Sequence, residues 1–318
     1  MKTRGITFAI SLLVLTLGGL AVSSHAQQTK VKFKFKDVTV PTAVESSAFG
    51  INNKKEIVGD YIDEAGAQEA MFAKGNNVTS VSCPAGPASF SSVNSAGSAT
   101  ESMDDDDTPC GNGIPIYYFG PHPHWGYLQQ DWGSILTESL AINDGNQVAG
   151  LWQDPNQTFH GFLYDLETNT FTPFDPPGQL EAEPDPHPWG LNKWALLVLW
   201  TVDPASGLAH SYLFDGTSFT QIDVPGALQS FAHGINGNGD IVYTVQDANG
   251  DNWGVFFYAT LRQFYYFNQP DGRDNTRAYG LNDEVQTKAG IKLEIVGDYT
   301  LPGSSLHRAY EATVTIKP

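Results

Sequence analysis

The chain has 318 residues, of which 41% are hydrophobic and 12% aromatic, and its formal net charge is −18. This hydrophobic content is too high for a disordered protein, so a packed core is expected. The surplus of acidic residues excludes a general nucleic-acid binder, which needs lysine and arginine against phosphate, and it argues against attachment to anionic lipid.

The first 26 residues have the layout of an export signal. Lys2 and Arg4 precede an apolar run from residue 6 to 22, and the small residues Ser24 and Ala26 stand three and one places before a cleavage point. The run is short and has no positive flank after it, so a cleaved signal peptide at 1–26 is favoured over a membrane anchor. We predict a secreted or periplasmic protein with no membrane span after cleavage.

A short sequence motif that ends in asparagine then occurs six times, and successive asparagines are 42 to 49 residues apart. After each asparagine come a turn and three further short segments rich in β-branched and aromatic residues, and no helical apolar stripe is sustained. Four short strands per repeat are typical of a propeller blade, so six repeats predict an all-β, six-bladed β-propeller of four-stranded antiparallel blades. The aligned residues are Asn52, Asn94, Asn143, Asn192, Asn236 and Asn282.

The two ends of the chain indicate how the ring closes. The sixth repeat ends with little room for a fourth strand, whereas residues 31–40 resemble the fourth strand at 219–225 and alternate lysine with phenylalanine. We therefore predict that this N-terminal strand completes the last blade and leaves one face in water; a merely peripheral strand is the alternative. The predicted domain covers residues 27–318, with blades at about 44–86, 87–133, 134–180, 181–227, 228–273 and 274–318.

The repeated phrases also resemble a known family. They read G-I-N at 50–52, I-V-G-x-Y at 57–61, H-G-F-L-Y at 160–164 and I-D-V-P-G at 222–226. This pattern resembles the HAF family of bacterial extracellular repeat proteins, and residues 140–227 carry nearly all of it twice, whereas the second repeat is the most divergent. The resemblance implies a secreted β-repeat protein and no particular reaction.

Two cysteines, Cys83 and Cys110, are expected to form one disulfide, because an exported chain meets an oxidising compartment; two free thiols are the alternative. The repeat places both of them in adjacent blades on the face that carries the second-to-third and fourth-to-first connections. The longest fourth-to-first connection, residues 176–188, is on that face, so we expect the functional face there.

An aspartate opens most of the turns between second and third strands, where its carboxylate is expected to accept hydrogen bonds from the backbone of the same turn. These residues are Asp63, Asp104, Asp154, Asp203 and Asp247. The stretch Asp247, Asn249 and Asp251 resembles the start of a calcium loop, but Tyr258 stands where that loop needs glutamate. We therefore predict no cofactor, with Ca²⁺ at these three residues as the alternative.

Three histidines open the third strands of their repeats at equivalent positions, and they are expected to be structural because equivalent positions lie apart around a ring. They are His160, His210 and His307. The candidate site comes instead from variation inside the repeat, at the positions three and five residues before the asparagine, which share one face if strand alternation is unbroken.

The large residues at those positions are expected to cluster near one mouth of the central channel. They are Glu138, His187, Trp189, His233, Arg277 and Tyr279. An acid, two imidazoles, a guanidinium and two aromatic rings suit a concave ligand site. The alternative is that these side chains plug the channel and pair with one another.

Two classes of function remain open. The first is a monomeric, non-catalytic binding or scaffold module for a small molecule, glycan, peptide or cell-envelope component. The second is an extracellular hydrolase or lyase, with a histidine or tyrosine as base and Arg277 steadying negative charge. The first is favoured because the sequence has no recognisable nucleophile–base pair or metal-ligand set. Convergence of Glu138, His187, His233 and Tyr279 within about 4–6 Å around an open cavity would favour catalysis.

Overall fold

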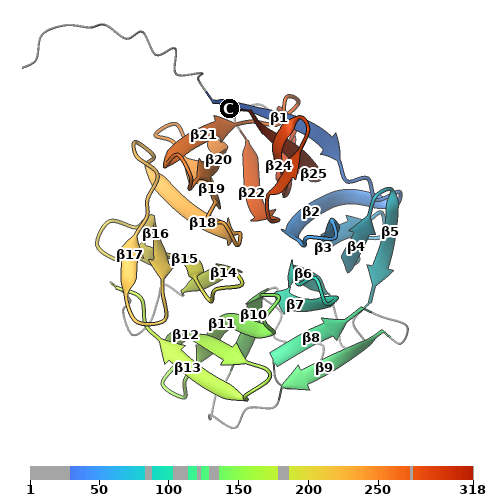
Figure 1. Cartoon of the computed structure of the whole chain (residues 1–318). Coiled ribbons are helices and arrows are strands. Elements are labelled where there is room, and N and C mark those ends of the chain that lie inside the picture. The colour runs from blue at the N-terminus through green and yellow to red at the C-terminus, as the bar shows by residue number, and fades with distance from the viewer. Residues whose placement is uncertain are drawn as a thin grey trace, which may run out of the picture.

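The computed structural model describes residues 29–82, 88–102, 114–119, 123–128, 136–177, 186–272 and 275–317. Their strands form six antiparallel sheets arranged as blades around a central axis (Figure 1). In the first five blades the four strands run outward from the axis in chain order. The prediction of a six-bladed β-propeller is confirmed.

Strand bounds in the first three blades follow the repeat. Blade one contains β2 (Ala43–Ile51), β3 (Glu56–Asp63), β4 (Gln68–Lys74) and β5 (Asn77–Val81). Blade two contains β6 (Ser89–Val93), β7 (Ser98–Ser102), β8 (Ile114–Tyr118) and β9 (His124–Leu128). Blade three contains β10 (Leu136–Ile142), β11 (Gln147–Gln153), β12 (Phe159–Asp165) and β13 (Thr170–Phe174).

The remaining blades continue the same order, with one addition. Blade four contains β14 (His187–Leu191), β15 (Leu197–Asp203), β16 (Leu208–Phe214) and β17 (Phe219–Gln221). Blade five contains β18 (Gln229–Ile235), β19 (Ile241–Gln246), β20 (Asn252–Tyr258) and β21 (Gln263–Phe267). Blade six contains β22 (Thr276–Leu281), β24 (Gly290–Thr300) and β25 (His307–Lys317), and it departs from four strands because β23 (Val285–Thr287) pairs with β24.

The N-terminal strand closes the ring. β1 (Lys30–Asp37) runs antiparallel along β25, from Lys30 opposite Lys317 to Asp37 opposite Tyr310 (Figure 1). Its lysines are exposed, whereas Phe33 stacks on Phe267 of blade five with ring centroids 4.6 Å apart. The strand therefore has one wet face and one packed face, and the predicted closure is confirmed.

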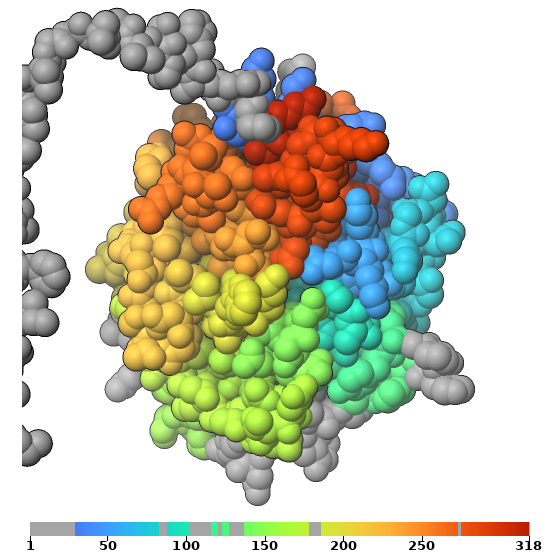
Figure 2. All heavy atoms as spheres, in the orientation of Figure 1, coloured from blue at the N-terminus to red at the C-terminus, as the bar shows by residue number. Residues whose placement is uncertain are grey.

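The hydrophobic core lies between neighbouring blades rather than within any one of them. One cluster, for example, joins Phe256 and Phe267 of blade five to Leu293 and Tyr310 of blade six. In the space-filling view the side chains of the blades also meet at the centre of the ring (Figure 2). Each blade thus buries its two faces against its neighbours, which is the usual way in which a propeller is stabilised.

Every innermost strand contains the same irregularity. Its pairing with the second strand shifts register immediately before the residue that stands two places ahead of the repeat asparagine. In blade five, for example, Ala232 pairs with Tyr243 and Gly234 pairs with Val242, so His233 is an extra, bulged residue. A β-bulge redirects the side chain that it inserts. The side chains of several bulged residues line the cavity at the centre of the ring, which is described below.

The residue after the bulge is small, because neighbouring innermost strands come very close there. A Cβ atom on Gly234 would lie 2.7 Å from the carbonyl oxygen of Tyr279 in blade six. Real Cβ atoms do not approach backbone oxygen this closely, so only glycine fits at this distance. The small residues of this position therefore reflect the tight packing of the innermost strands.

The repeat asparagines join the blades through a relay of hydrogen bonds. From blade one to blade six, each side-chain Nδ2 donates to the backbone oxygen of the next asparagine, at 2.9, 3.2, 2.9, 3.0 and 3.2 Å in turn. The Oδ1 atom of Asn143 also accepts from the backbone nitrogens of Gly145 and Gln147, both at 2.9 Å. One buried side chain therefore closes its own turn and holds the neighbouring blade.

The aspartates of the second-to-third turns act as predicted where the structure describes them. The Oδ1 atoms of Asp63, Asp154 and Asp247 each accept two backbone N–H bonds from their own turn, and that of Asp203 accepts one. Asp247 Oδ1 accepts from Asn249 at 2.8 Å and from Asp251 at 3.1 Å. Turn closure is confirmed, whereas the prediction of no cofactor and its alternative, Ca²⁺ at this turn, are not tested by these contacts.

Several predictions fall on residues outside the described ranges. They concern the signal peptide at 1–26, Cys83, Cys110, Asp104 and most of the long connection at 176–188. Among the described residues, no helix is long and apolar enough to cross a membrane.

Candidate functional site

A cavity of about 100 Å³ lies at the centre of the ring. Its lining comes from all six blades, and it includes the last residues of the innermost strands and the first residue of the turns that follow them. The cavity therefore opens toward the first-to-second turns. The expectation that the site lies on the face of the second-to-third and fourth-to-first loops is wrong for this cavity, because innermost strands run from that face to the opposite one.

Four rings from the bulge positions form the floor of the cavity. Tyr279 contacts His233 and Phe49 edge-on, with ring centroids 4.8 and 5.0 Å apart. Trp189 completes the cluster at 5.7 Å from His233 and 6.1 Å from Phe49. These side chains fill the centre of the ring and present ring surface to the cavity above them. The same residues therefore fit both alternatives from the sequence, a plug of the channel and a ligand site.

The floor is uncharged at neutral pH. Burial lowers the pKa of His233 to about 3, with smaller effects from the charges of His187 and Arg277. Burial also raises the pKa of Tyr279 far above its usual value. Neither ring exchanges a proton near neutrality, so a contact made by a charged His233 is not expected in that range.

Two ring nitrogens of the floor are buried without a hydrogen-bond partner among the described residues. They are Nδ1 of His233 and Nε1 of Trp189. An unpaired buried nitrogen costs about 1–3 kcal/mol, which a purely structural plug of aliphatic side chains would avoid. Nε1 of Trp200, outside the cavity lining, is in the same state, so these nitrogens alone do not assign a role to the floor.

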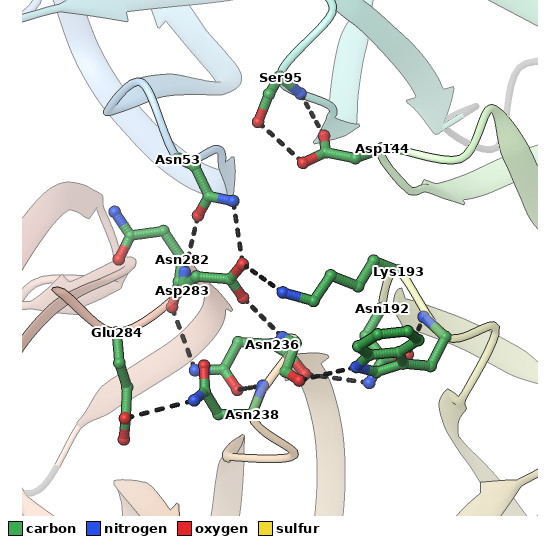
Figure 3. Close-up of polar contacts among 12 residues, drawn as sticks. Asn53, Ser95, Asp144, Asn192, Lys193, Asn236, Asn238, Asn282, Asp283 and Glu284 are labelled. Carbon is green, nitrogen blue, oxygen red and sulfur yellow. Dashed lines mark hydrogen bonds and ion pairs between the residues drawn. The ribbon is translucent and has the colours of Figure 1, made fainter.

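Polar residues form the rim of the cavity, each directly after a repeat asparagine (Figure 3). The carboxylate of Asp283 accepts from the backbone nitrogen of Gly237 at 2.6 Å, from Asn53 Nδ2 at 3.2 Å and from Lys193 Nζ at 3.3 Å. On the other side of the mouth, Asp144 accepts from the backbone nitrogen and the hydroxyl of Ser95, at 2.6 and 3.1 Å. Donors and acceptors at the mouth are therefore held in place by contacts between blades.

Lys193 reaches Asp283 by passing over blade five. A Cβ atom on Gly237 would lie 2.4 Å from Cε and 2.6 Å from Nζ of Lys193, so glycine leaves the space through which the lysine side chain runs. The ion pair is partly exposed, with 44% of the lysine side chain in solvent, and such pairs contribute at most about 1 kcal/mol. A ligand can therefore displace the lysine at little cost.

The predicted site residues divide into two groups. Trp189, His233 and Tyr279 line the cavity, whereas Glu138, His187 and Arg277 do not. The prediction assumes that alternate residues share a face, but the residue three places before the asparagine is itself the bulged residue, so it does not share a face with the residue five places before. The cluster of all six side chains is therefore not formed.

The three remaining residues have other partners. His187 stacks on Trp200 with ring centroids 3.8 Å apart, and burial lowers the pKa of His187 to about 4. Glu138 is half-buried and lies opposite Leu151 in the sheet. Arg277 donates from Nε to the buried carboxylate of Asp298 at 2.9 Å.

The third-strand histidines lie apart from the cavity. His160 and His210 pair with aspartates at the ends of the fourth strands, at 2.7 Å from Asp175 and 2.6 Å from Asp223. His307 instead contacts the guanidinium of Arg277 and lies 3.8 Å from Glu45 of blade one. Their predicted structural role fits these contacts, which tie strands and blades together.

Sequence reasoning missed Phe49 in the floor and the whole rim. The signal was present, because the residue after the repeat asparagine varies strongly between blades. That position was interpreted only as part of a turn. The rim residues are Asn53, Ser95, Asp144, Lys193, Gly237 and Asp283.

Two carboxyl groups share an environment just outside the rim. Asp240 is fully buried, and its side chain accepts from Asn236 Nδ2 and from the backbone nitrogen of Ala259, both at 2.9 Å. Burial, together with the neighbouring Asp240 carboxyl, raises the pKa of Glu284 to about 7. The seam between blades five and six therefore holds a proton on this pair under mildly acidic conditions.

This proton predicts a pH-dependent stability. The pKa of the Glu284 carboxyl is about 7 in the folded protein, above its usual 4.5. The protonated carboxyl therefore contributes its full share to the free energy of unfolding below about pH 4.5, and this contribution is lost as the pH rises through 7. Between pH 5 and pH 8 the free energy of unfolding of the wild type should fall, and replacing Glu284 by glutamine should make this fall smaller by about 1–2 kcal/mol. Thermal unfolding at both pH values measures the difference. Glu167→Gln, which removes an exposed charge, is the control, and equal pH slopes for both variants would contradict the assignment.

Comparisons with known proteins support the fold and leave the family open. No family model matches the chain, and no curated protein matches it in sequence. A protein of unknown function from Dyadobacter fermentans matches 90% of this chain and 99% of its own, with 11% identity and a TM-score of 0.59. A mutant of AofleA from Arthrobotrys oligospora matches 89% and 86%, with 9% identity and a TM-score of 0.51.

A fungal lectin from Aleuria aurantia, described as a six-bladed β-propeller, covers 87% of this chain and 93% of its own, at 11% identity and a TM-score of 0.49. At such identities the likeness concerns the fold alone. The six-bladed propeller is shown by the six sheets of the structure itself, and the specific resemblance to HAF proteins is matched by no family model.

Proposed function

We propose that this protein is a non-catalytic binding module that takes the terminal sugar unit of a glycan into the cavity at the channel mouth. One observation carries the proposal: a cavity contributed by all six blades combines an aromatic floor with a rim of fixed polar groups. Its volume of about 100 Å³ is below the 300–1,000 Å³ typical of sites that enclose a whole drug-sized ligand. The cavity therefore suits one end of a longer molecule.

The polar groups of the rim match a polyhydroxylated ligand. A hydroxyl group both donates and accepts hydrogen bonds. Asp144 and Asp283 offer acceptors at the mouth, whereas Asn53 and Lys193 offer donors. The rings of the floor offer apolar surface to the C–H faces of a sugar, as aromatic side chains do in sites with one apolar and one polar side. Two carboxylates beside one ammonium group disfavour an anionic ligand.

Binding is better supported than hydrolase or lyase chemistry. Glu138 and His187 are not among the lining residues, so the four groups expected for acid–base work do not surround the cavity. A general base works best with a pKa near the operating pH, and burial holds that of His233 at about 3. The proposal therefore assigns orientation and stacking roles to the floor.

The setting of this activity follows from the sequence. We propose an exported HAF-type protein, secreted or periplasmic and monomeric, released by cleavage after Ala26 and crosslinked between Cys83 and Cys110. The support is the charged and apolar layout of residues 1–26 and the presence of two cysteines in a chain with that layout.

A glycan array followed by calorimetry tests the proposal. The purified protein should bind a set of glycans with a common terminal unit, and Trp189→Ala should weaken binding by about 1–3 kcal/mol, because part of the stacking surface is lost. Trp253→Ala, which removes an indole outside the cavity lining, is the control. Binding to peptides but to no glycan, or wild-type affinity in Trp189→Ala, would refute the proposed function.

A further inference from the structure

An indole ring stands exposed beside the mouth of the cavity. Trp194 directly follows Lys193 of the rim and is 68% exposed, more than any other large hydrophobic side chain in the described ranges. Other blades place lysine, alanine, glycine, asparagine or glutamate at this point of the repeat. Because the ring buries little surface, packing of the fold does not explain why tryptophan occurs here.

The exposed ring is nevertheless held in one orientation. The backbone nitrogen of Trp194 donates to Asn192 Oδ1 at 2.9 Å, within the turn that the repeat asparagine closes. The indole Nε1 donates to the backbone oxygen of Gly237 in blade five, also at 2.9 Å. A side chain fixed before binding loses little conformational entropy when a ligand stacks on it.

The ring is also connected to the groups of the mouth. Lys193 Nζ lies 5.6 Å from the centroid of the Trp194 ring, and the same ammonium group pairs with Asp283. Gly237 bonds Trp194 through its oxygen and Asp283 through its nitrogen. The indole is therefore one residue outside the lining, beside the rim of the mouth at the seam of blades four and five.

We infer that Trp194 forms an outer subsite on which the second sugar unit of the bound glycan stacks. This inference rests on the proposed function, since the cavity holds the terminal unit. A cavity of about 100 Å³ leaves the next unit outside, and the exposed indole of Trp194 adjoins the rim through its contacts with Lys193 and Gly237. The ligand is accordingly an oligosaccharide, and a free monosaccharide engages only the inner part of the site.

Calorimetry with matched sugars tests the outer subsite. The probes are the methyl glycosides of glucose, galactose, mannose and N-acetylglucosamine, and the disaccharides cellobiose, galactobiose, mannobiose and chitobiose. The wild-type protein should bind one disaccharide about tenfold more tightly than its monosaccharide, as stacking on an exposed ring allows. Trp194→Ala should abolish that ratio without changing monosaccharide affinity, and Trp194→Phe should keep most of it.

Tyr266→Ala is the matched control, because it removes a ring that is 48% exposed on β21, the fourth strand of blade five. It should leave both affinities unchanged. If Trp194→Ala keeps the wild-type ratio, or if the wild type binds both sugars of each pair equally, the outer subsite is refuted and the proposed function stands. If the wild type binds none of these sugars, the outer subsite and the glycan-binding function fail together.

Discussion

Replacing Asn143 by alanine should lower the free energy of unfolding by about 3–4 kcal/mol. The side chain is 3% exposed and makes hydrogen bonds with two backbone nitrogens of its own turn and with the backbone oxygen of Asn192. Each such bond contributes about 1 kcal/mol, and the partners left unpaired in the buried turn add to the loss. One substitution thus weakens both a turn and a contact between blades.

Urea denaturation of the purified variant measures this loss. Asn156→Ala is the control, because this asparagine is exposed and its side chain bonds only Asp154 within a surface turn. The control should stay within about 0.5 kcal/mol of the wild type. A loss below 1 kcal/mol for Asn143→Ala would show that the relay of asparagines contributes little to the union of the blades.

Removal of residues 29–38 should cost at least about 5 kcal/mol, which is the whole stability of many domains. All eight residues of β1 pair with β25, and Phe33 and Phe35 contact Phe267 and Tyr310. Without them, blade six loses its outer strand and exposes the paired edge of β25. We expect a chain that does not unfold cooperatively and that associates through the free edge.

Circular dichroism on heating and size-exclusion chromatography follow both effects. The control replaces Lys32, Lys34 and Lys36 by glutamine, since these side chains are exposed on the wet face of β1 and their loss leaves the pairing intact. A truncated protein that stays monomeric and melts like the control would mean that β1 is a peripheral addition to a ring already complete.

The fold could be predicted because the residues that recur in the repeats make equivalent structural hydrogen bonds in different blades. The asparagine recurs since its side chain serves a turn and a neighbouring blade at once, and the aspartates recur since they close turns. Closure could be predicted from the alternation of lysine and phenylalanine, which suits only a strand with one wet face. The extra strand β23 was not predictable from the other repeats, which lack it.

The candidate site could be predicted only in part, because it depends on a bulge. Counting along the innermost strand identified Trp189, His233 and Tyr279, which are the bulged residues themselves. The same count joined them to His187 and Arg277, on the assumption that alternate residues share a face. One inserted residue breaks that rule, and nothing in the local sequence distinguishes a bulged strand from a regular one.

The pairing of β1 with β25 also sets the order in which the protein can be assembled. The strand nearest the N-terminus finds its partner only after residues 307–317 have left the ribosome, so the ring cannot close before all six blades have been synthesised. Until then β1 is an unpaired apolar strand, and the positive charges at every second position discourage it from pairing with other chains. The lysines that face water in the folded propeller therefore also oppose aggregation of the incomplete chain, until β25 is available to pair with β1.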